Sequence, residues 1–118
     1  NISYTCFYTT KSYMDENPDI IQKFTNAIYK GQQWVQQHTS EEVADSIISF
    51  FPGTDKEVIV KVIDNYKNIK AYSETPEVSE DGLNKLMDII QGYDESLITE
   101  RPDFNIIVNN SFAKQAIK

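Results

Sequence analysis

The chain has 118 residues, and its 11 lysine and arginine residues face 18 aspartate and glutamate residues. The resulting net charge of −7 repels phosphate backbones, so we expect no nucleic-acid partner. Cys6 is alone, which excludes an intrachain disulfide, and no apolar run approaches the ~20 residues that a transmembrane helix needs. The length suits one domain with a core of its own.

Residues 2–10 alternate small polar side chains with large ones, among them Tyr4 and Tyr8. A period of two with aromatic and β-branched residues predicts a strand. The aromatic residues in and just after this segment, Tyr4, Phe7, Tyr8 and Tyr13, are also candidates for contacting a flat organic ligand, by stacking or through a phenol hydroxyl. Packing in a core is the alternative interpretation of the same side chains.

Helix signals follow in chain order. Asn17-Pro18-Asp19 is a typical helix start, and apolar residues at 3/4 spacing extend the predicted helix over 17–38. Gly31 on its apolar face predicts that another element packs closely there. Thr39 and Glu42 have the spacing of a capping box and begin a second helix, 40–51.

The second half of the chain continues in the same way. A repeat of the capping signal predicts a helix over 55–69, and Ser79 begins one over 80–93. Residues 104–108 are either a short extended piece or a buried loop, and Asn110 caps a last helix, 111–117. The predicted fold class is therefore mostly α with one or two short strands, an α+β fragment forming a single domain, 1–118.

No pattern in the sequence predicts catalysis. His38 is the chain's single histidine and lies where a helix ends, a place that suits its ring for structural reasons. Most acidic pairs lie at helix starts, where capping explains them, and the four glycines are too far apart to form a phosphate loop. We therefore predict a protein that is not an enzyme, with no catalytic residues, no metal site and no cofactor.

Several short motifs, taken in order, resemble one known family. They are Tyr4-Thr5-Cys6-Phe7, Lys11-Ser12-Tyr13, Asn17-Pro18-Asp19, Ile21-Gln22-Lys23-Phe24-Thr25-Asn26-Ala27-Ile28, Gly31-Gln32-Gln33-Trp34-Val35, Phe51-Pro52, Thr54-Asp55, Tyr66-Lys67 and Val108-Asn109-Asn110-Ser111-Phe112-Ala113. The set is similar to the C-terminal portion of ABC-transporter substrate-binding proteins of the nitrate/sulfonate/taurine and thiamine-precursor class. It covers essentially the whole chain but only the last third to half of a typical member.

The resemblance implies a fold and a function. Members of the family have two α/β lobes that close over one small solute, such as a sulfonate, nitrate or a thiamine-pyrimidine-like molecule, and deliver it to a membrane permease. They are extracytoplasmic, lipid-anchored at the cell surface of Gram-positive bacteria and periplasmic otherwise. By this resemblance the chain is the helical C-terminal part of a periplasmic-binding-protein-like α/β lobe. Tyr4, Thr5 and Tyr8 are then the candidates near the ligand cleft.

Two further expectations depend on this chain being a fragment of a larger protein. Because it opens at Asn1 and not at a methionine, we expect a processed protein or an excised piece. A lone strand edge invites pairing with another chain, so we expect the isolated fragment to dimerise or to exchange strands. The alternative function is a small helical protein-interaction domain whose acidic surface docks a basic partner.

Overall fold

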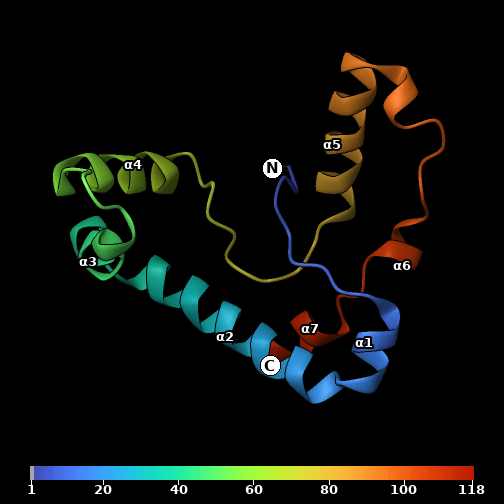
Figure 1. The fold of residues 1–118 in the computed structure, drawn as a ribbon, viewed down its shortest axis with the longest axis horizontal. Helices are drawn as coiled ribbons and strands as arrows, with labels where there is room; N and C mark the ends of the chain where they lie inside the picture. The colour runs from blue at the N-terminus through green and yellow to red at the C-terminus, as the bar shows by residue number, and fades with distance from the viewer. Residues whose placement is uncertain (1) are drawn as a thin grey trace. The chain divides into compact units, whose positions relative to one another are not determined.

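The computed structural model describes residues 2–118, and it divides them into two compact units. The first unit comprises the residues up to Asn26 together with Glu77–Lys118, and the second comprises Ala27–Pro76. Within the described residues the regular structure consists entirely of helices (Figure 1). The α-helices are α1 (Lys11–Glu16), α2 (Pro18–Gln37), α3 (Ser40–Ile47), α4 (Lys56–Asn68), α5 (Glu80–Tyr93), α6 (Phe104–Ile107) and α7 (Ser111–Ile117). The prediction of a single domain stays a prediction.

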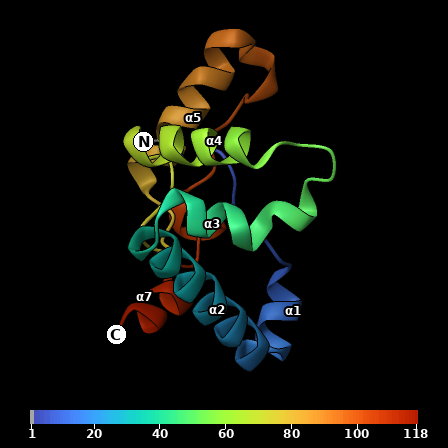
Figure 2. The ribbon, with the colours of Figure 1, turned by 90° about the vertical axis from the view of Figure 1, so that its left-hand side faces the viewer.

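The second unit is built on the packing of α3 against α4. These helices lie one beside the other (Figure 2), joined by the 3₁₀ turn Ile48–Phe50 and a loop in which Gly53 takes a φ of 84°. Glycine takes this left-handed conformation without the steric cost that a Cβ brings. The buried cluster between the two helices consists of Val43, Ala44, Ile59 and Ile63. Trp34 and Val35, from the later turns of α2, pack against the same cluster.

Side-chain amides fix the connection that follows α4. Gln32 donates from Nε2 to the carbonyl oxygen of Thr75 at 3.1 Å, and Gln33 donates likewise to Glu74 at 2.9 Å. Both glutamines are on α2, so the irregular segment that follows α4 is held against that helix. Backbone carbonyls in such a segment have no helical partner, and the two amides supply one to each.

The first unit holds its parts together in a similar way. In α2, Gln22 donates from Nε2 to the carbonyl oxygen of Phe112 in α7 at 3.0 Å. Asn110 exchanges two hydrogen bonds with the backbone of Val78, accepting from its N–H at 3.0 Å and donating to its carbonyl at 2.9 Å. Met87 of α5 and Ala113 of α7 are the apolar residues of this unit that are buried.

The predicted helices lie close to the observed ones, and the signals at their starts can now be checked individually. Thr39 and Glu42 form the capping box in full, and Ser79 accepts from the Gly82 N–H at 3.2 Å. Asn110 lies at the start of α7 but its side chain makes no capping hydrogen bond, because it is paired with Val78. The predicted cap is wrong there, and Asn109 instead accepts from the Ser111 N–H at 2.9 Å.

The strand predicted for residues 2–10 is wrong for the described residues. The segment has no regular secondary structure, and its N–H groups make two backbone hydrogen bonds, from Ser3 to the Gly82 carbonyl and from Tyr4 to the Ile2 carbonyl. A strand is stabilised by a ladder of bonds to a second strand. Among residues 2–118 no such second strand is present, so the alternating pattern has nothing to pair with.

Two other local predictions change. Residues 104–108 are neither extended throughout nor a buried loop, because Asp103 accepts from the Asn105 N–H at 2.8 Å and starts the short helix α6. Helix α1 was not predicted. Its signals are local: Thr10 accepts from the Tyr13 N–H at 3.2 Å, and Lys11 pairs with Asp15 at 2.7 Å. Gly31 has no atom within 4 Å of the position a Cβ would take, so the predicted close packing is absent there.

Replacing Ile63 should weaken the second unit most. Its side chain is 1% exposed within the α3–α4 cluster, so Ile63→Ala removes buried methyl groups and leaves a cavity. We expect the free energy of unfolding to fall by about 2–5 kcal/mol, measured by urea denaturation. Phe50→Ala, at an exposed side chain of the same unit, serves as the control and should change it by less than ~0.5 kcal/mol. Equal losses in both variants would contradict the assignment of the core.

The capping box should make stability depend on pH. The Thr39 backbone N–H donates to the Glu42 carboxylate at 2.8 Å and the Thr39 hydroxyl donates at 3.1 Å, and both bonds lower the pKa of Glu42 from its ordinary value of 4.5. A pKa that is lower in the folded than in the unfolded state stabilises the fold above pH 4.5. That contribution is lost as the pH falls from 4.5 through the folded pKa.

Glu42→Gln should therefore make the loss of stability below pH 4.5 shallower, as measured by urea unfolding at a series of pH values. Glutamine can still accept the Thr39 bond, so the helix itself should remain. Glu41→Gln removes the same charge from the same turn without altering the box, and it should keep the full pH dependence. Identical pH profiles for the two variants would show that the box is not the cause.

Candidate functional site

The residues predicted from the sequence to contact a ligand, Tyr4, Thr5 and Tyr8, lie on the opening segment of the first unit. Tyr4 is 81% exposed and Tyr8 is 95% exposed, and Thr5 is also exposed. The segment is anchored on both sides of them. The Ser3 N–H donates to the carbonyl oxygen of Gly82 at 3.2 Å, and Thr10 caps α1.

One aromatic side chain of this segment does pack on the fold. The Phe7 ring stands edge to face on the Phe24 ring of α2, with centroids 4.9 Å apart and planes at 83°. Such pairs contribute about 0.5–1.5 kcal/mol beyond the burial of their surface. Phe7 thus gives the segment one contact with α2, although its side chain is still 73% exposed, and Tyr4 and Tyr8 are more exposed still. Free rings of this kind can stack on a planar molecule or donate a phenol hydrogen bond.

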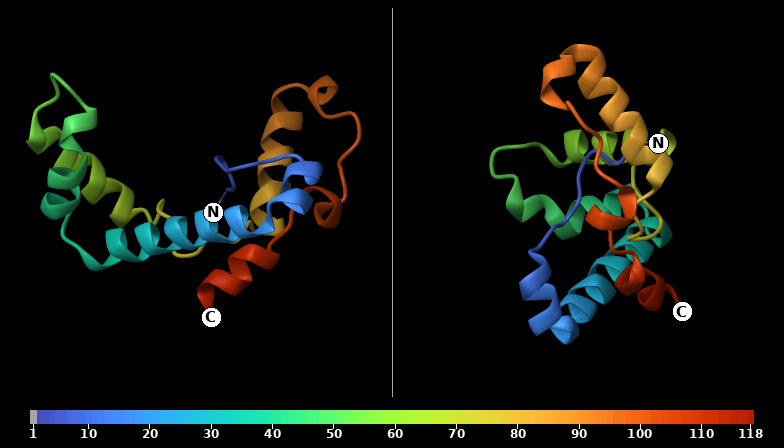
Figure 3. Two further views of the ribbon diagram at one scale, coloured as in Figure 1. Left: turned by 60° about the horizontal axis from the view of Figure 1, so that its bottom comes forward. Right: turned by 90° about the vertical axis from the view of Figure 1, so that its right-hand side faces the viewer.

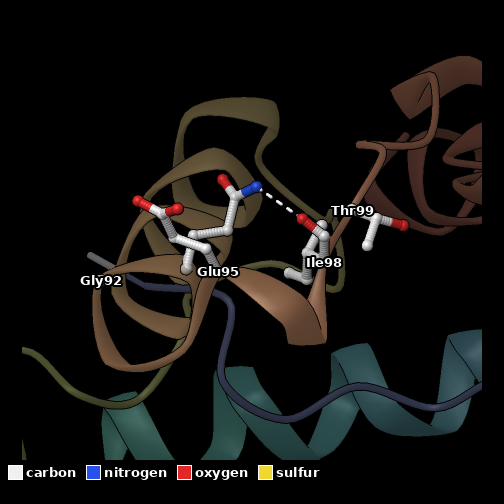
Figure 4. A pocket seen from close by; sticks show the side chains of 5 residues that line it. Gly92, Glu95, Ile98 and Thr99 are labelled. Atoms are coloured by element: carbon white, nitrogen blue, oxygen red, sulfur yellow. Dashed lines mark hydrogen bonds between the residues drawn. The ribbon is translucent and has the colours of Figure 1, made fainter.

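A pocket of about 430 Å³ lies elsewhere in the first unit, beside the end of α5. Figure 3 shows how the chain turns back after α5, through the 3₁₀ turn Glu95–Leu97. The residues that line the pocket are Gln91, Gly92, Glu95, Ile98 and Thr99. Its shape depends on a hydrogen bond from the Gln91 amide to the Ile98 carbonyl at 2.7 Å, drawn in Figure 4. Arg101 extends this arrangement, donating to Gln91 Oε1 at 2.8 Å and to Asp88 at 2.6 Å.

The residues around this pocket form a turn that side-chain hydrogen bonds hold in place. Glu95 and Thr99 lie on opposite sides of the hydrogen bond and their side chains do not converge on a common point (Figure 4). A solute site needs a few polar groups aimed at the ligand within mostly apolar walls. None of the residues that line this pocket was predicted from the sequence to contact a ligand. Their neighbour Asp94 carries a local turn signal: it accepts from the Ser96 hydroxyl at 2.7 Å and from the Ser96 N–H at 2.9 Å, and both bonds lower the pKa of Asp94.

A second pocket, in the second unit, is too small for a solute. Its volume is about 30 Å³, and its lining residues are Gln36, Lys67, Lys70, Tyr72 and Glu74. Burial raises the pKa of the Tyr72 phenol, and proximity to Tyr66, whose ring centroid is 5.7 Å away, adds to this effect. A cavity of this size has room for about one water molecule.

His38 takes part in packing. Its ring stacks on Trp34, with centroids 4.2 Å apart, and its Nδ1 lies 2.7 Å from the Trp34 carbonyl oxygen. A carbonyl oxygen only accepts, so Nδ1 carries the proton and donates. The Lys67 amine donates to the His38 carbonyl oxygen, which ties the end of α2 to α4. This geometry explains the position of His38 without a catalytic role.

The described residues contain neither a cluster suited to a metal ion nor a helix suited to a membrane. In residues 2–118 there is no group of three or more histidine, cysteine, aspartate or glutamate side chains placed to hold a metal ion. None of the helices over the same residues has the length and apolar character needed to cross a membrane.

Comparison with known proteins relates the chain to a bacterial protein. The chain is 35% identical over 114 residues to a Bacillus subtilis (strain 168) protein named "Putative binding protein YtlA", a match that covers 97% of this chain. It spans about a third of that relative's length, 34%. No protein-family model matches the chain, and no solved structure matches it.

The comparison supports a coarse statement about function. The chain is related to a protein named as a binding protein, and its name describes no enzyme. The relationship covers 97% of the chain, so it extends over both units. The assignment of Tyr4, Thr5 and Tyr8 to a ligand stays a prediction.

Proposed function

We propose that the chain is the C-terminal part of the solute-binding component of an ABC importer. The single observation that carries the proposal is the 35% identity, over 97% of this chain, to a protein named as a binding protein. The ordered motifs that resemble the nitrate/sulfonate/taurine and thiamine-precursor class specify which kind of binding protein. In this role the whole protein captures a small sulfonate, nitrate or thiamine-pyrimidine-like solute and delivers it to the permease.

The proposed mechanism is a shift between open and closed arrangements of two lobes. A solute that binds between the lobes favours the closed state only to the extent that it binds that state more tightly. The proposal places the protein outside the cytoplasmic membrane, lipid-anchored in a Gram-positive organism and periplasmic otherwise. The exposed rings of Tyr4 and Tyr8 supply this chain's contribution to the cleft.

A second candidate is a small helical interaction domain. Two observations favour it: regular structure within residues 2–118 is wholly helical, and the net charge of −7 gives the surface an affinity for basic partners. It differs from the first proposal in its ligand, a protein in place of a small molecule. The two can therefore be separated by one screen.

That screen is a thermal-shift measurement on the full-length protein and on the 118-residue chain alone. A solute present at a hundred times its dissociation constant adds about 2.7 kcal/mol to the free energy of unfolding. For a unit the size of one lobe, about 150–250 residues, this corresponds to a rise of roughly 5–10 °C in Tm. We expect one of the sulfonate, nitrate or pyrimidine solutes to shift the full-length protein and to leave the chain alone unchanged. If no solute shifts the full-length protein, solute binding is wrong and the interaction domain becomes the better account.

Tyr8→Ala in the full-length protein should weaken the solute identified in this way by about threefold to tenfold, the range expected for one aromatic contact. Isothermal titration calorimetry gives the dissociation constant. Tyr93→Ala is the matched control, because Tyr93 is 87% exposed but lies at the last residue of α5, whereas the opening segment is bonded at Ser3 to Gly82 in the first turn of that helix. An unchanged constant for Tyr8→Ala would remove the opening segment from the site while leaving the importer proposal in place.

A further inference from the structure

The start of α7 is held by contacts from three distant parts of the first unit. Gln22 of α2 donates to a carbonyl oxygen of α7, and the Asn110 side chain exchanges two hydrogen bonds with the backbone of Val78. The third contact comes from α1, where the amide nitrogen of Asn109 donates to the sulfur of Met14 at 3.3 Å. Of the groups that make these contacts, the Met14 sulfur is the one that an oxidant changes chemically.

The direction of the Asn109 amide is fixed by its second hydrogen bond. Its Oδ1 accepts from the Ser111 N–H at 2.9 Å at the start of α7, so its Nδ2 is turned towards Met14. A thioether sulfur has no proton to donate and is a weak acceptor. The pair therefore has one arrangement, in which the amide N–H is directed at the sulfur.

The two methionines of the chain differ in how accessible they are to an oxidant. Met87 of α5 is 6% exposed, whereas Met14 is half-buried on α1, a short helix that has no buried residue. An oxidant has to reach the sulfur before it can react, so exposure sets the order in which methionines are modified. A small oxidant such as hydrogen peroxide should therefore modify Met14 well before Met87.

The hydrogen bond from Asn109 determines which side of the Met14 sulfur can react. A thioether sulfur has two lone pairs, and the amide N–H occupies one of them. The other lone pair attacks one oxygen of hydrogen peroxide and the O–O bond breaks. That oxygen stays on the sulfur, which is oxidised to a sulfoxide, and the second oxygen leaves with both protons as water. Because the new oxygen is added on the free side, one of the two sulfoxide epimers should predominate.

We propose that Met14 is a reversible oxidation site that controls how α1 is held to the start of α7. In the sulfoxide the sulfur carries a partial positive charge and its oxygen points away from Asn109, so the hydrogen bond between the two side chains is lost. The contacts of Gln22 and Val78 remain, and the first unit therefore loosens at α1 without unfolding. Sulfoxide reductases, each of which acts on one epimer, restore the thioether and with it the bond.

The first test is peptide mapping by mass spectrometry after brief treatment of the 118-residue chain with hydrogen peroxide. The chain carries Cys6→Ser, which removes its exposed thiol. We expect Met14 to be oxidised about tenfold faster than Met87, and one of the two sulfoxide reductases to remove most of the product. Asn109→Asp keeps an oxygen for the Ser111 N–H but has no N–H for the sulfur, so it should give both epimers.

The second test measures the effect of oxidation on the fold. The oxidised chain should melt about 2–5 °C below the untreated chain, the shift expected for the loss of one weak hydrogen bond. Met14→Leu lacks the sulfur, so the same treatment should leave its Tm unchanged. The proposal is overturned by oxidation of Met87 as fast as Met14, by an epimer ratio that Asn109→Asp does not alter, or by an unchanged Tm after Met14 is oxidised.

Discussion

The chain buries little apolar surface, and this determines how the rest of its structure is held together. Among residues 2–118 six apolar residues are buried: Val43, Ala44, Ile59, Ile63, Met87 and Ala113. Burial of apolar surface is the dominant favourable term in folding, so a core this small leaves much of the arrangement to polar bonds. Amide side chains supply them, with Gln22, Gln32 and Gln91 each donating to a carbonyl oxygen outside its own helical ladder.

Because so few apolar residues are buried, apolar side chains remain exposed on both units. Tyr4 and Tyr8 extend from the first unit with their rings free, although Phe7 between them is anchored on Phe24. In the second unit, Ile59 and Ile63 of α4 are buried against α3, whereas apolar side chains on another side of the same helix, such as Val58 and Val62, are about half exposed. The relative named as a binding protein is about three times as long as the matched segment, and a longer protein offers further surface for packing.

How far the sequence predicts this structure depends on how local the signal is. Thr39 and Glu42 are three residues apart and fix the start of α3 by themselves, so that helix could be placed from the sequence. A strand at residues 2–10 needs a distant partner, and no local pattern shows whether the chain contains one. Asn110 has the composition of a cap, but its amide is taken by Val78, 32 residues away. The pocket near Glu95 likewise depends on the contacts of Arg101 with α5, which sequence spacing does not reveal.

The central claim is that this chain belongs to a two-lobed solute-binding protein, and hydrogen exchange at residues 2–10 tests it most directly. In the chain alone the described backbone bonds of this segment involve only the N–H groups of Ser3 and Tyr4, so exchange should be fast. If, as we propose, the chain is part of a larger two-lobed protein in which this segment pairs with the sheet of a lobe, exchange along the segment should be slow in the full-length protein. Fast exchange in both would mean that the segment joins no sheet, and it would contradict the account.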